Sequence, residues 1–220
     1  IGRRLGSQRG EFDLLDIRGF DAPREAEVAF LRALAAPSAS RAYEICPRIL
    51  TQGGYESYLS ARTKKFRANL KRAARRAREH GDTRIGLEIP SAALFDELVD
   101  VEREGWKWAQ GSAFLQDPRR RKFLHAALLA PTIHAEVFTC RVDGELAAFA
   151  ITFRERDQRL YYLPSFRTRY TDVGAFLLGE IVRDSFERWL SCVDLMQGDE
   201  SYKLAWSTDT RQVREIAVAG

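Results

Sequence analysis

The stretch AEVFTCRVDGELAAFAITF, at residues 135–153, decides the fold of this chain. Residues 135–142 read as one strand, and a second apolar strand follows at residues 146–153. Between them, Asp143-Gly144 is a dipeptide typical of the two-residue turn that joins antiparallel strands. The pattern therefore predicts a β-hairpin, and RLYYL at residues 159–163 predicts a third strand that Pro164 ends.

Segments with helical or strand periodicity flank this hairpin on both sides. From residue 84 onward we expect a strand at 84–89, a helix from Pro90-Ser91, a loop at 105–116, a helix at 118–129, the three strands, a helix at 174–190, a strand at 192–195, a short helix at 201–206 and a strand at 213–218. Earlier in the chain we expect strands at 12–18 and 42–50 and a helix at 23–35. This order indicates an α+β fold with a mixed, mainly antiparallel central sheet flanked by helices.

Composition indicates a globular protein with a real core. The 220 residues are 45% hydrophobic, which is ordinary for a folded domain and argues against disorder. No apolar run approaches the ~18 residues that a membrane-spanning helix needs, so we expect no membrane span. The chain begins at Ile1 and its only methionine is Met196, so we expect it to be part of a longer protein.

The cysteines and histidines favour neither disulfides nor a metal site. Each cysteine lies in an apolar run far from the others, which predicts buried, reduced thiols and a cytoplasmic location. The histidines are scattered, and no CxxC or HExxH pattern occurs, so we expect no metal. The residues concerned are Cys46, Cys140, Cys192, His80, His125 and His134.

Residues 62–84 predict a strongly basic helix. Only Glu79 and Asp82 oppose its positive charges, and Gly81 is a natural helix end. Apolar residues recur at helical spacing, as a narrow stripe that could dock the helix on the domain. The basic face is then either simply solvated or binds an anionic ligand or RNA. The basic residues are Arg62, Lys64, Lys65, Arg67, Lys71, Arg72, Arg75, Arg76, Arg78 and Arg84.

Five short words occur in order along the chain: TKKFRANLKR at 63–72, EGWK at 104–107, VDGE at 142–145, YLP at 162–164, and GDESYK at 198–203 followed by Trp206. With the order of elements, they resemble the GNAT acetyltransferases grouped around the cellulose-biosynthesis protein CelD, which are related to Fem-type peptidyltransferases. The resemblance implies a GNAT-like acyltransferase domain with a basic N-terminal helix at 53–220. It also implies that residues 1–52 are the tail of a preceding GNAT-like half.

The resemblance implies a binding turn for coenzyme A after the third strand. The strand end at Leu163 and the segment Val173-Gly174-Ala175 would hold acetyl-CoA or another acyl-CoA. Free N–H groups at a helix N-terminus suit a phosphate, and Arg167 and Arg169 could meet its charge. Alternatively, Thr171 or Asp172 simply caps this helix, and Asp172 would repel a phosphate. The segment also departs from the QxxGxG/A pattern of most GNAT proteins.

Acyl transfer to an amine needs a base for the amine and an acid for the leaving thiolate. The resemblance places Tyr202 at the position of the acid, with Asp199 as the base. Lys203 could hold an acidic part of the acceptor. Alternatively, Tyr202 and Trp206 pack in the core one helical turn apart, and Asp199 caps the helix.

Trp106 and Lys107 are candidate acceptor-binding residues. Tryptophan in a loop can stack on a sugar ring, although filling a gap in the core is its commoner role. The resemblance favours a place for both residues in the pocket. Glu102 and Glu104 nearby are alternative bases.

Three functions follow. The first is transfer of an acyl group, with acetyl expected, from acyl-CoA to an amino group of a cell-envelope saccharide or its precursor, without a covalent enzyme intermediate. The second is Fem-like transfer from aminoacyl-tRNA, with the basic helix facing the tRNA. The third is a GNAT fold that serves as an interaction module without catalysis.

Overall fold

The protein is seen in a computed structural model that describes residues 13–34 and 36–219. The chain forms two compact units. The central unit is Ile49–Met196, and the flanking unit combines the described residues up to Arg48 with those from Gln197 onward.

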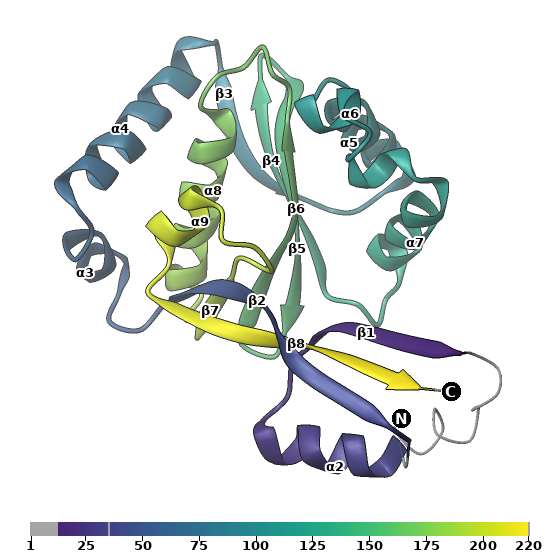
Figure 1. The fold of residues 1–220 in the computed structure, drawn as a ribbon. Coiled ribbons are helices and arrows are strands. Elements are labelled where there is room, and N and C mark those ends of the chain that lie inside the picture. The colour runs from purple at the N-terminus through teal and green to yellow at the C-terminus, as the bar shows by residue number, and fades with distance from the viewer. Residues whose placement is uncertain (1–12, 35, 220) are drawn as a thin grey trace. The chain divides into compact units, whose positions relative to one another are not determined.

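The central unit is built on a mixed sheet in the order β7-β6-β5-β4-β3 (Figure 1). The pairs β3–β4, β4–β5 and β5–β6 are antiparallel, and β6–β7 is parallel. The α+β fold with a mainly antiparallel sheet is therefore confirmed. Its strands are β3 (Thr83–Glu88), β4 (Ala135–Val142), β5 (Glu145–Glu155), β6 (Gln158–Phe166) and β7 (Cys192–Asp194).

The β4–β5 hairpin forms as predicted. Val142 pairs with Glu145, and the two residues between them have positive φ angles, 50° at Asp143 and 85° at Gly144. Aspartate and glycine tolerate this left-handed backbone better than other residues, and the turn matches the twist of the two strands. The hairpin is therefore specified by local sequence.

The sequence predicted that Pro164 ends β6, and this prediction is wrong. The strand continues to Phe166, and Pro164 lies opposite Ala150 of β5. On the other side of β6, β7 pairs only with residues 158–160. The later part of β6 therefore has no β7 partner, and a strand edge is where a residue without an N–H is tolerated.

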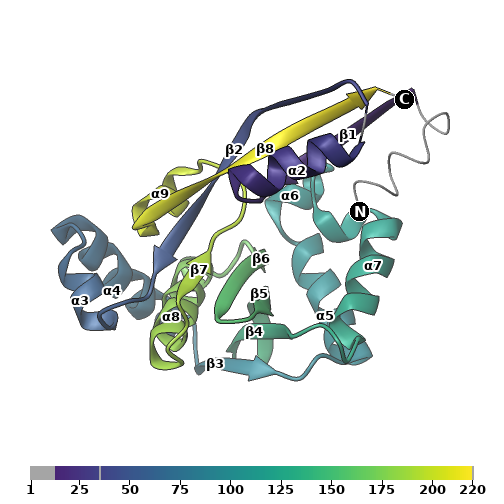
Figure 2. The ribbon, with the colours of Figure 1, turned by 90° about the horizontal axis from the view of Figure 1, so that it is seen from below.

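Helices cover both faces of this sheet (Figures 1 and 2). One face carries α8 (Val173–Glu187) with α4 (Lys64–Glu79) against it, and the other carries α5 (Ala92–Arg103) and α7 (Pro118–Leu129). The second face buries Leu98 and Leu124 against Phe149 of β5. Three short helices, α3 (Tyr55–Ser60), α6 (Trp106–Ala109) and η1 (Phe114–Gln116), were not predicted.

The basic helix is shorter than predicted. Thr63 caps its start by accepting a hydrogen bond from the Phe66 N–H at 3.1 Å. The helix ends at Glu79, and Gly81 follows with φ 145°. A Cβ atom on Gly81 would lie 2.3 Å from a carboxylate oxygen of Asp143, so glycine is required where the chain turns into β3.

The flanking unit is a three-stranded antiparallel sheet in the order β1-β8-β2. Leu34 of α2 is buried there with Ile216 and Val218 of β8. Expected boundaries at residues 12 and 35 lie outside the described residues. The elements are β1 (Leu14–Phe20), α2 (Arg24–Leu34), β2 (Ser38–Leu50), α9 (Ser201–Trp206) and β8 (Asp209–Ala219).

All three cysteines are buried and outside any disulfide, as predicted. Across residues 13–34 and 36–219, every helix is too short or too polar to cross a membrane. Nor do the histidine, cysteine and acidic side chains within those ranges gather into a group able to hold a metal ion.

Candidate active site

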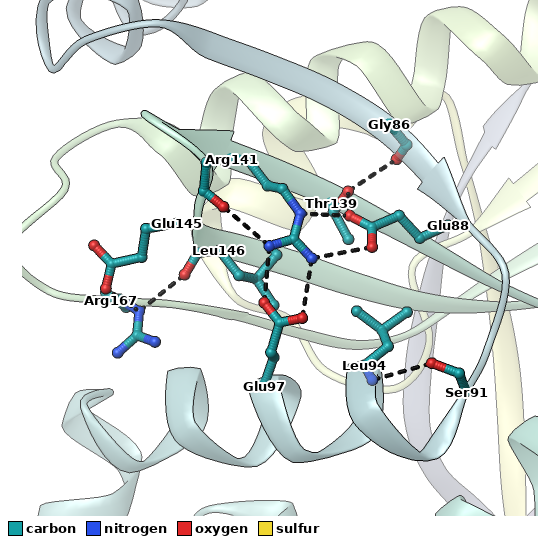
Figure 3. A network of polar contacts seen from close by, with 11 residues as sticks. Gly86, Glu88, Ser91, Leu94, Glu97, Thr139, Arg141, Glu145, Leu146 and Arg167 are labelled. Carbon is teal, nitrogen blue, oxygen red and sulfur yellow. Dashed lines mark hydrogen bonds and ion pairs between the residues drawn. The ribbon is translucent and has the colours of Figure 1, made fainter.

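The turn between β6 and α8 is held firmly at its first residue. The Arg167 N–H donates to the Ala147 carbonyl, and its Nε donates to the Leu146 carbonyl, each at 2.8 Å. Figure 3 shows this second bond beside Glu145. Arg167 therefore serves as a structural anchor between the turn and β5.

The positive charges of the turn are neutralised within the domain. Arg167 and Arg169 both form ion pairs with Glu104 and Glu145. The Tyr170 hydroxyl also donates to Glu145 at 2.6 Å. Hydrogen bonds from Arg169 and then Tyr170 lower the pKa of Glu145, against a smaller effect of burial. A phosphate at this turn would therefore compete with two carboxylates for the arginines.

Asp172 adopts the left-handed conformation, with φ 65°. This places it at the first glycine of the QxxGxG/A pattern, with Arg169 in the place of glutamine and Gly174 as the second glycine. Asp172 is the N-cap residue of α8, but its side chain makes no cap hydrogen bond and instead pairs with Arg76 at 3.3 Å. The capping interpretation is therefore right about the position of Asp172, but its side chain does not cap the helix, and the turn lacks the first glycine of the pattern.

The N-terminus of α8 presents free backbone donors. The first helical bond runs from the Phe176 N–H to the Asp172 carbonyl at 2.9 Å, so the N–H groups of Val173, Gly174 and Ala175 lie before it without an acceptor in the helix. The Ala175 side chain is exposed, whereas Val173 is buried. Such an end attracts anions through its free N–H groups and its dipole.

A β-bulge lies in β6 just before the turn. Leu163 pairs with Ile151 and Tyr161 with Thr152, so Tyr162 is an extra residue on β6. The Leu163 side chain packs in the hydrophobic core, which leaves only its main chain for a ligand. Bulges often occur beside active sites, but nothing in the sequence signals this one.

The corner between α5 and α6 brings Trp106 and Lys107 to the end of β6. A Cβ atom on Gly105 would lie 3.5 Å from Ser165 Oγ, and the Thr168 hydroxyl donates to the Glu104 carbonyl at 3.3 Å. Trp106 is 52% exposed, and the Lys107 ammonium lies 5.8 Å from its ring centre. Trp106 is thus available to a ligand and does not fill the core.

Figure 3 shows what ties α5 to the sheet. Arg141 of β4 binds Glu88 of β3 at 2.7 and 3.0 Å and Glu97 of α5 at 2.8 and 3.2 Å. A guanidinium shared by two carboxylates fixes direction as well as distance. The network positions α5, and with it Glu104, against the arginines of the turn.

Glu102, an alternative base, is committed to structure. It is almost fully buried, and its two oxygens accept hydrogen bonds from the Phe114 and Leu115 N–H groups at 3.1 and 2.6 Å. Burial raises the pKa of Glu102, although these bonds and nearby cations oppose the shift. Glu104 is in turn occupied by the two arginines.

The flanking unit contains the other predicted residues. Lys203 is buried and forms an ion pair with Glu200 at 3.0 Å, and its ammonium also donates to the Gln197 carbonyl. Gly198 beside them has φ 121°, a backbone conformation that favours glycine. Binding of an acceptor by Lys203 stays a prediction.

Tyr202 and Trp206 have different environments on α9. Trp206 is buried, whereas Tyr202 is 43% exposed and so is not simply a core residue. Burial of the hydroxyl, with a smaller effect of Glu200, raises the pKa of Tyr202 to about 12. Asp199 is exposed and does not cap α9, whose N-cap residue is Glu200. The catalytic roles of Tyr202 and Asp199 stay predictions.

Asp194 is a buried acid that sequence reasoning missed. It ends β7 opposite Leu160, at the last pair between β6 and β7. Its carboxylate accepts a hydrogen bond from the Met196 N–H at 2.8 Å. In the sequence, Asp194 is a single carboxylate at the end of an apolar run. Because acidic residues are common at strand ends, this is a weak signal for a functional residue.

Comparison with solved structures finds similar folds at low sequence identity. FemX has a TM-score of 0.65 and 10% identity, over 94% of this chain and 72% of that one. L-PGS from Bacillus licheniformis has a TM-score of 0.62 and 12% identity, over 89% and 65%. The C-terminal domain of an Agrobacterium fabrum protein assigned as a lysylphosphatidylglycerol synthetase has a TM-score of 0.58 and 16% identity, over 83% of this chain and 62% of that one. The chain thus spans less than two thirds of the last two structures.

The sequence matches none of the curated proteins with which it was compared. It does match a family of protein domains described as "Acetyltransferase (GNAT) domain", over residues 64–204. This match covers more than half of the chain and includes the β6–α8 turn and α9 up to residue 204. The chain therefore belongs to the GNAT family of acetyltransferase domains.

Proposed function

We propose that this chain transfers an acyl group, acetyl in the first instance, from an acyl-CoA to an amine. The observation that supports this most is the turn at Asp172. A left-handed residue leads directly into a helix whose first three N–H groups lack acceptors in the helix, and Gly174 keeps their approach open. That arrangement suits the pyrophosphate of coenzyme A.

Acyl-CoA, when bound, would supply the thioester carbonyl that the amine attacks, and coenzyme A would leave as the thiol. Tyr202 and Asp199 are the residues proposed to move the protons. Tyr202, whose pKa is raised from 10 to about 12, is protonated at neutral pH, so it can donate to the leaving sulfur but not act as a base. Asp199 is the proposed acceptor of the amine proton.

The acceptor we propose is an amino group of a cell-envelope saccharide or its precursor. Trp106 exposes an aromatic face beside the end of β6, and the Lys107 ammonium lies next to it. An exposed indole suits the apolar face of a sugar ring, and an ammonium suits a carboxylate or phosphate on the same molecule. The CelD-like sequence words support this choice of acceptor.

Ala175 offers a sharp test of the cofactor. Its side chain is exposed in the first turn of α8, where a glutamate favours the helix. We expect Ala175→Glu to fold normally and to lose acetyl-CoA binding at least tenfold in titration calorimetry, because its carboxylate repels the pyrophosphate. Ala175→Gln, of equal size, should bind like the wild type. Equal affinity of both variants, or no binding by the folded wild type, contradicts the proposal.

A second candidate is transfer from aminoacyl-tRNA, which the Fem-like resemblance suggests. The supporting observation is α4, whose exposed Lys64, Lys65, Lys71 and Arg72 make no ion pair within the described residues. At the β6–α8 turn, by contrast, Glu104 and Glu145 already neutralise the arginines, which disfavours tRNA binding at that place. Salt-sensitive tRNA binding that is lost in a triple variant, Arg72→Gln, Arg75→Gln and Arg76→Gln, would favour this candidate over acyl-CoA.

A further inference from the structure

Helix α7 carries large apolar side chains on two sides. Leu124, Ala127 and Leu128 are buried and dock the helix on the domain. Phe123 and Leu129 lie elsewhere around the helix and are 59% and 46% exposed. A helix that is apolar all round normally becomes buried all round, so the second apolar side of α7 calls for an explanation.

The exposed apolar residues share one face of α7. Positions 119, 122, 123, 126, 129 and 130 recur in the steps of three and four that keep side chains on one side of a helix. Ile133, 41% exposed, follows just after the helix end, where its N–H donates to the Ala130 carbonyl at 3.1 Å. We call this surface the α7 face; it consists of Arg119, Lys122, Phe123, Ala126, Leu129, Ala130 and Ile133.

Four consecutive cations begin the helix, at residues 119–122. Cations are unfavourable there, because the helix N-terminus already carries the positive end of the dipole. Two of them find partners inside the domain: Arg121 donates to the Leu115 carbonyl at 2.9 Å, and Arg120 lies over the Phe114 ring. Arg119 and Lys122 are exposed on the α7 face and pair with no acid among the described residues.

We infer that the α7 face docks on an anionic lipid surface. Phenylalanine, leucine and isoleucine beside lysine and arginine are the side chains with which helices lie in the membrane interface. Anionic headgroups would neutralise the two unpaired cations, while the apolar side chains enter the acyl boundary. Nucleic acid fits this surface less well, because it would leave Leu129 and Ile133 without an apolar partner. The docking is independent of the acyl donor.

Co-sedimentation with vesicles tests this inference. The probes are vesicles of phosphatidylcholine alone and of phosphatidylcholine mixed with phosphatidylglycerol. We expect the protein to sediment with the anionic vesicles only. Arg119→Gln with Lys122→Gln should weaken that binding by about tenfold or more, because each cation near an anionic surface contributes about a factor of five. The double variant Phe123→Ser with Leu129→Ser should also weaken binding to the anionic vesicles, even at low salt, where the attraction of the cations is not screened.

The matched control is Lys64→Gln with Lys65→Gln, which removes the same charge from an exposed part of α4. It should bind vesicles like the wild type. All four α7 substitutions are at exposed positions, and circular dichroism verifies that the variants remain folded. The inference is overturned if the wild type ignores anionic vesicles, or if the α4 control loses as much binding as the α7 variants. It is also overturned if light scattering shows a dimer that only the Phe123/Leu129 variant dissociates while vesicles stay unbound.

Discussion

Gly174 stands against the ring of Phe166: a Cβ atom on Gly174 would lie 3.0 Å from Phe166 Cδ1. Phe166 ends β6 and Gly174 belongs to the first turn of α8, so this contact sets how the helix leaves the strand. The same absence of a side chain keeps the free N–H groups of the helix open. The absence of a side chain at Gly174 therefore bears on both packing and ligand approach, and experiment can separate the two.

We expect Gly174→Ala to change stability little and binding considerably. Phe166 is 38% exposed and can turn aside, and alanine favours a helix over glycine by up to about 1 kcal/mol. Affinity for acetyl-CoA should nevertheless fall severalfold, because the methyl group occupies the approach to the N–H groups. Thermal unfolding and titration calorimetry measure the two effects. Full affinity in the variant would show that Gly174 serves packing alone.

Asp172→Gly should raise both stability and affinity for acetyl-CoA. Glycine adopts the left-handed backbone without steric strain, whereas a residue with a side chain pays up to about 1 kcal/mol there, and aspartate pays less than most. The lost pair with Arg76 is a surface contact worth less than about 1 kcal/mol. Asp172→Asn is the control, since it removes the charge and keeps the side chain. If the carboxylate repels the cofactor, both variants bind acetyl-CoA more tightly than the wild type; unchanged affinity in Asp172→Asn contradicts that.

If Tyr202 is the general acid, Tyr202→Phe should lower kcat by about 100-fold or more and leave KM nearly unchanged. The phenylalanine keeps the ring and loses only the hydroxyl group that would donate the proton. A variant with full kcat would remove Tyr202 from the chemistry.

Arg159 should be the most sensitive ionic residue for stability. Its side chain is fully buried and bonds to Glu136 at 3.0 Å, Asp184 at 2.8 Å and Ser185 at 2.6 Å, so it joins β4, β6 and α8. Arg159→Met leaves carboxylates without their partner and should cost about 3 kcal/mol or more. Arg188→Gln removes an exposed arginine from the same acids and should cost less than about 1 kcal/mol. Urea unfolding compares them, and equal losses would contradict the assigned importance of burial.

The domain should lose stability in acid through Glu88. Hydrogen bonds from Arg141, more than that from Thr139, lower the pKa of this carboxyl against the opposing effect of burial. In the unfolded chain, Glu88 takes up a proton below a pKa of about 4.3. Above that pH the carboxylate is charged in both states, and its full contribution to the free energy of unfolding is present. The contribution is lost as the pH falls through the lower folded pKa. Urea midpoints at several pH values should therefore fall less steeply for Glu88→Gln than for the wild type.

Local patterns predicted a large part of the fold. Asp143-Gly144 specified a hairpin, and α7 begins at Pro118 after the cap Asp117, whose carboxylate accepts from the Arg119 N–H at 2.7 Å. In these cases the residues that define the element are neighbours in the chain, so the sequence contains the information. The GNAT family could also be inferred from the order of such elements.

Other features depend on residues far apart in sequence. Pro164 is compatible with β6 only because β7 ends its pairing at residue 160. The bulge at Tyr162 and the short helix α6 likewise depend on neighbouring strands and on the packing of the α5 corner. Predictions made from a window of sequence cannot include these partners.

The candidate site shows the same division. The sequence by itself determined where the turn lies and that it carries two arginines before a helix. Only the tertiary structure decided that those arginines are already paired, because Glu104 reaches Arg167 across 63 residues of sequence. Ion pairs form through space, and the distance between two charges is set by how the elements pack. The position of the turn therefore follows from residues close together in the sequence, whereas the neutralisation of its charge depends on the tertiary packing.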